Sequence, residues 1–87
     1  MEIKKELIKR DIAGDTVLVP VGKTVMENNG LFILNELGAF IWDVLPELGS
    51  EEEAVSAVLR EYDIDEDTAR SDTAEFFEKL RGFGIID

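Results

Sequence analysis

The apolar positions in the first third of the chain predict strands. Residues 7–12 show a mixed period of two, residues 16–19 are rich in β-branched side chains, and residues 31–34 form a short apolar run. Segments of this kind, separated by glycine, proline and asparagine, are typical of β-strands joined by turns. The pattern therefore predicts a small antiparallel sheet of three strands.

From Asn35 onward the apolar positions follow a helical spacing instead. Asn35, Ser50 and Asp65 each stand where a residue can cap the start of a helix, and Ser50 with Glu53 forms a capping box. Each of these residues is followed by apolar side chains at intervals of three and four. Three helices after three strands predict one α+β domain that spans residues 1–87.

The aromatic side chains have different places in these helical stripes. Phe40 and Phe76 fall in the middle of a stripe, so we expect both in the core. Trp42 lies off the stripe, where it would cover a strand or be partly exposed. Phe77 lies at the border of the last helix's stripe, so a charge there is expected to cost less stability than a charge at Phe76.

The composition argues against catalysis. The chain contains no histidine and no cysteine, which removes the commonest general base and the thiol nucleophile. Residues 63–67, DIDED, imitate the start of a calcium loop, but Thr68 replaces the required glycine and Ala74 the bidentate glutamate. We therefore expect no enzyme activity, no cofactor and no metal site.

The charge is concentrated in the second half of the chain. Residues 1–46 carry five Lys or Arg and seven Asp or Glu, a net of −2, whereas residues 47–87 carry four and thirteen, a net of −9. This acidity disfavours nucleic acids and anionic membranes. The carboxylates either keep the helix surfaces solvated or steer a basic partner. The N-terminus lacks the apolar run of a secretory signal, so a cytoplasmic location is expected.

The third predicted strand is the candidate binding element. Residues 31–34, LFIL, are apolar throughout and contain no lysine or proline to protect a sheet edge. An open edge of this kind can recruit an extended peptide through main-chain hydrogen bonds. The alternative is that a helix or the N-terminal segment covers the strand, and the pattern fits both arrangements.

Several segments resemble one known family. Residues 34–42, LNELGAFIW, resemble the LNxTGxxIW signature of the PqqD family, with Leu37 in place of the usual threonine. Residues 62–65, YDID, resemble the family's YDVD, and the last helix ends in a similar way at residues 84–86, GII. The early residues 17–22, VLVPVG, also fit, so the resemblance covers nearly the whole chain.

This resemblance implies a winged helix-turn-helix-like fold and a role as a recognition element for ribosomally made, modified peptides. Members of the family bind the leader of a precursor peptide along the third strand, beside the last helix, and present it to a modifying enzyme, often a radical S-adenosylmethionine protein. The residues that this role would assign to the peptide site are Leu31, Phe32, Ile33, Leu34, Thr73, Phe76, Phe77 and Leu80.

Two other classes of function remain open at this point. The same edge strand could pair with a second copy of the chain and form an oligomerisation module, so the protein would be a monomer or a homodimer. Winged helices also bind DNA, but the acidity of this chain argues against that use.

Overall fold

The computed structural model describes residues 1–21 and 32–87, and it begins with an antiparallel hairpin. Strand β1 (Leu7–Ile12) pairs with β2 (Asp15–Pro20), and Ile12 faces Asp15 across the turn. The turn residues Ala13 and Gly14 both have positive φ, 52° and 88°, as in the two-residue turns that match the twist of a hairpin. Glycine accepts this conformation without a steric cost.

The third strand lies on the other side of β2. Strand β3 (Phe32–Leu34) pairs antiparallel with β2, so the sheet order is β1-β2-β3. The predicted strand began one residue earlier, at Leu31, which lies outside the described residues. Since β2 occupies the centre of the sheet, β3 is an outer strand.

Helix α1 (Glu36–Val44) follows β3 directly. The Oδ1 atom of Asn35 accepts a hydrogen bond of 2.7 Å from the Gly38 amide, which confirms the predicted cap. Pro46 lies in the short 3₁₀ turn η1 (Leu45–Glu47), which ends this helical segment. A Cβ at Gly38 would lie 3.1 Å from the Phe76 ring, so this glycine lets α1 approach the last helix closely.

Helix α2 (Glu51–Glu61) starts at the predicted capping box. Ser50 Oγ accepts from the Glu53 amide at 3.2 Å, while the Glu53 carboxylate accepts from the Gly49 amide at 2.7 Å. The first bond satisfies a main-chain donor of the first turn that has no intrahelical partner, and the second ties Gly49, the residue before the cap, to the same turn.

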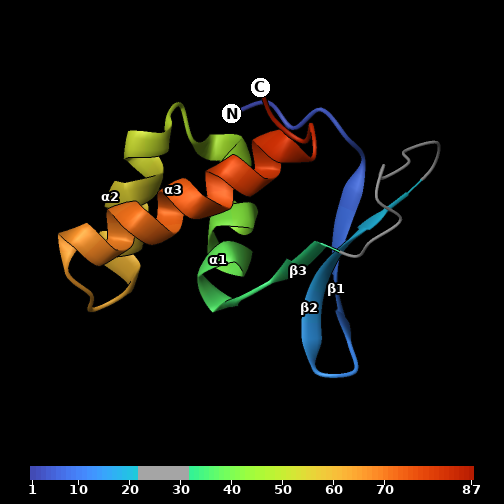
Figure 1. Ribbon diagram of the computed structural model, residues 1–87, viewed down its shortest axis with the longest axis horizontal. Coiled ribbons are helices and arrows are strands. Elements are labelled where there is room, and N and C mark those ends of the chain that lie inside the picture. Colours follow the sequence, from blue (N-terminus) through green and yellow to red (C-terminus); the bar gives the residue numbers. More distant parts are fainter. Residues whose placement is uncertain (22–31) are drawn as a thin grey trace.

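Helix α3 (Glu66–Gly82) is the longest element and crosses in front of α1 and α2 (Figure 1). Two residues beyond its last one, Gly84 has a φ of +70°, and two bonds close the helix end: Ile85 N–H donates to Leu80 O, and Gly84 N–H donates to Arg81 O. This is the Schellman arrangement, and it turns the apolar tail inward. The tail therefore packs on the core as predicted, with Ile85 fully buried.

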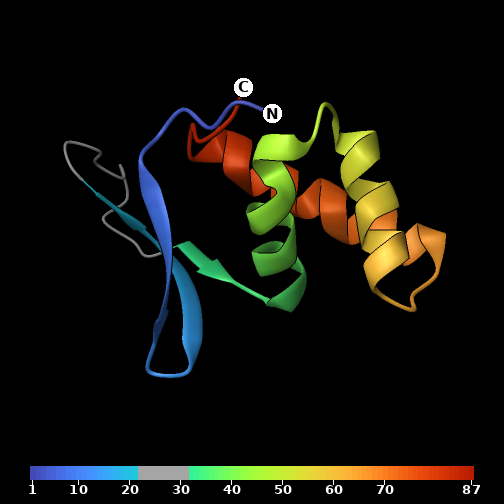
Figure 2. The ribbon, with the colours of Figure 1, turned by 180° about the vertical axis from the view of Figure 1, so that it is seen from behind.

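The chain ends meet at one side of the molecule, away from the tip of the hairpin (Figures 1 and 2). The Lys4 amide donates to the Ile85 carbonyl at 2.7 Å, and the Lys4 side chain pairs with Asp87. The N-terminal segment thus lies beside the C-terminal tail. The predicted α+β order of three strands and three helices, with its winged helix-turn-helix-like arrangement, is confirmed.

The core lies between the inner face of the sheet and the three helices. Trp42 is buried there, although its position off the stripe of α1 left partial exposure open. Phe40, expected in the core, is only half-buried and packs edge-on against Tyr62 instead. The core cluster is made of buried side chains from every layer: Leu18, Phe32, Leu34, Ile41, Trp42, Leu45, Leu48, Ala54, Val55, Val58, Ala69, Phe76, Phe77, Leu80, Ile85 and Ile86.

Candidate functional site

The outer edge of β3 is open in the described part of the chain. One edge of β3 pairs with β2 in the register Thr16↔Leu34, Val17↔Ile33 and Leu18↔Phe32. Across residues 1–21 and 32–87, no strand occupies the other edge. An edge strand leaves every second residue's N–H and C=O without a ladder partner, and these groups can bind an added strand. Within the described residues, the N-terminal segment does not cover this edge, because it lies beside the C-terminal tail.

A groove runs along this edge, between β3 and α3. Its volume is about 560 Å³, and the start of α1 closes one end of it. Figures 1 and 2 show β3 leading into the start of α1, with α3 crossing α1. The lining combines apolar floor residues with charged rim residues: Asp15, Phe32, Ile33, Leu34, Asn35, Leu37, Gly38, Asp72, Glu75, Phe76 and Lys79.

The three residues of β3 present two different faces. Phe32 and Leu34 are 4% and 5% exposed and point into the core, whereas Ile33 is 61% exposed on the opposite face of the sheet. Successive side chains of a strand alternate in this way. A peptide paired with β3 would follow the same alternation, so every second side chain would enter the groove.

Phe76 is the apolar residue of α3 that lines the groove. Its ring meets the Phe32 ring edge-on, with the centroids 6.0 Å apart, and lies against Gly38. Edge-on contacts between aromatic rings are favourable and hold both rings in place. The floor of the groove is therefore a fixed aromatic surface shared by β3 and α3.

Phe77 does not line the groove, although the sequence pattern placed it at the border of the stripe. Phe76, predicted in the core, is buried there and also lines the groove. Phe77 is fully buried, and the guanidinium of Arg81 lies 5.7 Å from its ring centroid. The helical spacing explains the difference, because Phe77 shares a stripe with Ala69, Thr73 and Leu80, and all of them are fully buried. This stripe faces the interior.

Thr73 and Leu80 were also predicted at the groove, and the structure places both behind it. Each is fully buried, and neither lines the groove. Of the predicted site residues, the structure brings together Phe32, Ile33, Leu34 and Phe76, while Leu31 lies outside the described residues.

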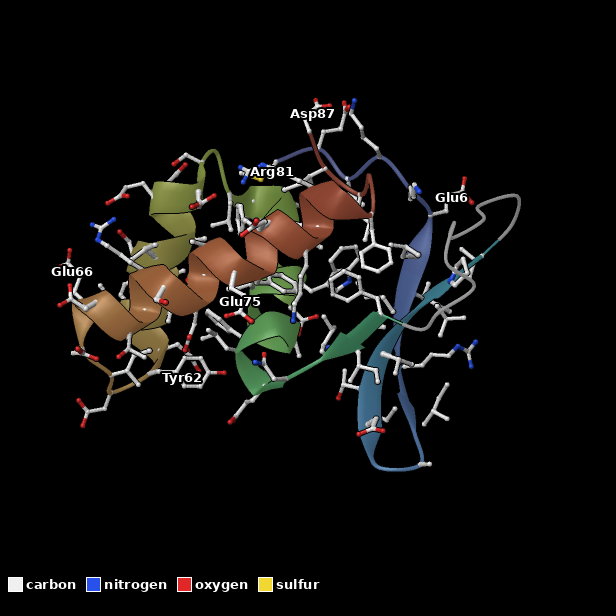
Figure 3. The ribbon with its side chains drawn as sticks, viewed as in Figure 1. Glu6, Tyr62, Glu66, Glu75, Arg81 and Asp87 are labelled. Carbon is white, nitrogen blue, oxygen red and sulfur yellow. The ribbon has the colours of Figure 1, made fainter. Side chains whose placement is uncertain are left out.

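The groove rim contains charged residues that the sequence interpretation missed. Asp72, Glu75 and Lys79 follow one another along α3 at intervals of three and four residues, so they share one side of the helix, next to Phe76. Figure 3 shows Glu75 on this side of the helix. The signal was present in the sequence, since three charged residues at this spacing beside an apolar stripe mark the border between core and solvent.

A second hollow of about 480 Å³ lies on the far side of α1, between α1 and α2. Phe40, Val44 and Leu48 form its apolar floor, and glutamates lie along its rim. The Tyr62 ring packs on Phe40, with ring centroids 5.6 Å apart. Burial, and then the charges of Glu36 and Glu61, raise the pKa of Tyr62 above its usual value.

A comparison with known families now decides the family of this chain. The family model described as "Coenzyme PQQ synthesis protein D (PqqD)" matches residues 15–86. The chain belongs to the PqqD family. Its match begins at β2 and includes β3, all three helices and the apolar tail. The resemblance noted in residues 34–42 is thereby confirmed.

A solved structure supports the same assignment of this PqqD-family chain. It is described as "TbiB1 in Complex with the TbiA(beta) Leader Peptide" and has 26% sequence identity and a TM-score of 0.71. The alignment covers 100% of the present chain and 95% of that chain. A comparison with curated proteins finds no significant match.

The described residues show neither a metal cluster nor a membrane span. Within residues 1–21 and 32–87, no three side chains of the metal-binding types lie together. In the same part of the chain, no helix is both long and apolar enough to cross a bilayer.

Proposed function

We propose that this PqqD-family protein binds the leader of a ribosomally synthesised precursor peptide and presents it to a modifying enzyme. The leader would add to the sheet as a fourth strand beside β3, with alternate side chains in the groove against Phe76. Family membership and the likeness to a chain solved with a leader peptide support this proposal.

The observation that carries the proposal is the open edge of β3 above an apolar floor. Main-chain groups of an edge strand bind any extended peptide, and pockets for alternate side chains then select among peptides. The groove supplies both parts, since Ile33 lies on the exposed edge strand while Phe32 and Phe76 form the floor beside it.

An adaptor role suits the chemistry of the chain better than catalysis. Neither histidine nor cysteine is present in the sequence, and the groove is lined by apolar side chains and by carboxylates on its exposed rim. Chemical modification of the peptide would then belong to a separate enzyme. We propose a radical S-adenosylmethionine protein, the class of enzyme that the family resemblance implies.

DNA binding is not supported by the surface of α3, the helix that a winged helix would place against DNA. Its exposed residues include Glu66, Asp67, Asp72, Glu75 and Glu78, which would repel a phosphate backbone.

An amide NMR titration tests the proposal, with the leader segment of a candidate precursor peptide encoded beside this protein. Shifts concentrated at Phe32–Leu34 and at α3 around Phe76 are the expected result. A peptide scan that replaces single amides by esters should then weaken binding at alternate positions, because an added strand directs only every second residue toward β3. Losses without this alternation would contradict strand addition.

Self-association through β3 is the competing outcome, and sedimentation at low concentration separates the two. A monomer that binds the peptide supports the adaptor. A tight dimer that shows no peptide shifts would instead mean that the edge pairs with a second copy.

A further inference from the structure

The two ends of the groove are lined by different parts of α3, because α3 runs in the direction opposite to β3. The start of β3 lies beside the end of α3, where the rings of Phe32 and Phe83 are 5.0 Å apart. Near the other end of the strand, Leu34 is followed by the cap Asn35 and by Gly38, against which Phe76 packs. Positions earlier in α3 than Phe76 therefore lie toward Leu34, and later positions lie toward Phe32.

This opposite direction separates the rim charges along the groove. Asp72 is one turn before Phe76 and lies toward the Leu34 end, whereas Lys79 is one turn after it and lies toward the Phe32 end. Seven residues of α-helix separate their Cα atoms by about 10 Å along the axis. Asp15 adds a second negative charge at the Leu34 end, because it precedes Thr16, the partner of Leu34 in the sheet.

The carboxylates at the Leu34 end are available to a ligand. Asp15 and Asp72 are exposed, and in the described part of the chain neither forms an ion pair. Lys79, by contrast, has Glu75 as a neighbour, with Nζ 3.7 Å from the carboxylate. One end of the groove therefore has two unpaired negative charges, while the positive charge at the other end is already partly compensated.

We infer that the bound peptide carries a lysine or arginine at the residue that lies over the Leu34 end of the groove. This inference rests on the proposed function and adds to it a charge preference and a direction. The apolar side chains of the peptide would occupy the floor, and the basic residue would fix which end of the segment lies beside Asp72. Exposed ion pairs are weak, so the preference is an affinity difference of about 2- to 5-fold for a single carboxylate.

A selection from displayed random short peptides tests this inference without knowledge of the natural leader. The full chain is immobilised, the enriched peptides are aligned on their alternating apolar residues, and the charge at each flank is counted. We expect lysine or arginine to be enriched at one flank only. Enrichment of acidic residues at both flanks, or of no charge at either, would overturn the inference while leaving strand addition intact.

A double-mutant cycle then locates the preference. One enriched peptide is compared with a version in which the basic residue is replaced by glutamine, on the native protein and on Asp72→Asn. Asp72→Asn should weaken the basic peptide about 2- to 5-fold and change the glutamine peptide very little. Equal losses for both peptides would contradict a charge contact at Asp72.

Glu78→Gln is the matched control, because it removes one exposed carboxylate from α3 outside the groove lining. It should leave the affinity of both peptides unchanged. Enriched peptides that do not shift the amides of Phe32–Leu34 would overturn the proposed function and the charge preference together. Shifts at these amides with no flank preference would overturn the charge preference alone.

Discussion

The two hollows of this molecule share α1 as a common wall, yet they differ in the feature that matters for binding a chain. Both have an aromatic floor and an acidic rim, with Phe76 in the groove beside β3 and Phe40 in the hollow beside α2. Their volumes, about 560 and 480 Å³, are similar. The groove adds the main-chain groups of an open strand, whereas the second hollow is enclosed by helices that satisfy their own main chain.

Main-chain hydrogen bonding, rather than apolar area, therefore separates a candidate peptide site from a surface depression. Apolar side chains alone would hold a peptide without fixing its direction or register. An edge strand restricts the peptide to an extended conformation, because its donors and acceptors repeat at the spacing of an extended chain.

The largest expected effect is the loss of stability on replacing Phe77, whose ring is buried behind the groove. Phe77→Ala should lower the free energy of unfolding by about 3–5 kcal/mol, because it leaves a cavity where a fully buried ring packs. Native domains are stabilised by only about 5–15 kcal/mol, so this variant should be close to unfolding. Chemical denaturation followed by the fluorescence of Trp42 measures the loss. A cost below that of Phe76→Ala would restore the groove assignment of Phe77.

The second expected effect is on leader affinity, and it distinguishes the groove from the second hollow directly. Phe76→Leu keeps an apolar side chain and should cost less than about 1.5 kcal/mol of stability. It removes the aromatic floor of the groove, so leader affinity should fall about 10-fold. Phe40→Leu is the matched variant in the second hollow and should leave leader affinity within about 2-fold of the native value. Calorimetric titration of both variants with the leader shows which hollow the peptide uses. Equal losses of affinity for the two variants would mean that the peptide does not use the groove.

The sequence predicted the fold more completely than the site, and neighbouring residues of α3 show why. Caps at Asn35 and Ser50 are local signals that involve a few adjacent residues, so they could be recognised without tertiary contacts. Which of Phe76 and Phe77 borders the groove depends on the orientation of α3 about its own axis. That orientation is set by contacts with Gly38, Phe32 and the tail, which are distant in the sequence.

The edge of β3 was similarly undecided, since covering a strand depends on the path of segments elsewhere in the chain. In the structure the N-terminal segment lies beside the tail, where Lys4 bonds to Ile85, rather than along β3. Phe40 was also misplaced, and the alternatives for Trp42 stayed open, because α1 has neighbours on several sides and one stripe does not describe its buried surface.

A smaller change in stability, opposite in sign to that of Phe77→Ala, is expected from a substitution at Thr73. Its hydroxyl is fully buried, and Oγ1 has no hydrogen-bond partner in the described part of the chain. Thr73→Val removes this unsatisfied polar group at nearly the same shape and should raise the free energy of unfolding by about 1 kcal/mol. Leader affinity should not change, because Thr73 lies behind the groove. Reduced affinity with unchanged stability would instead support the predicted peptide contact.

The smallest expected effect is a shift in the pKa of Tyr62, the single tyrosine of the chain, which reports on the second hollow because it packs on Phe40. Figure 3 shows it near the end of α2 and the start of α1, away from the chain ends. Because burial and the nearby Glu36 and Glu61 raise its pKa, the ultraviolet titration of the phenol should have its midpoint above the usual value of about 10. The neutral phenol is favoured in the folded state. Its stabilising contribution is therefore complete below the unfolded pKa and is lost as the pH rises through the folded pKa.

Glu61→Gln removes one negative charge beside this phenol and should lower the pKa of Tyr62, whereas Glu78→Gln, outside both hollows, should not. A saturating leader peptide should also leave the titration unchanged, since the groove and Tyr62 lie on opposite sides of α1. A shift of the midpoint on adding the peptide would place a ligand against Phe40. It would thereby show that the second hollow, despite having no open strand, also takes part in recognition.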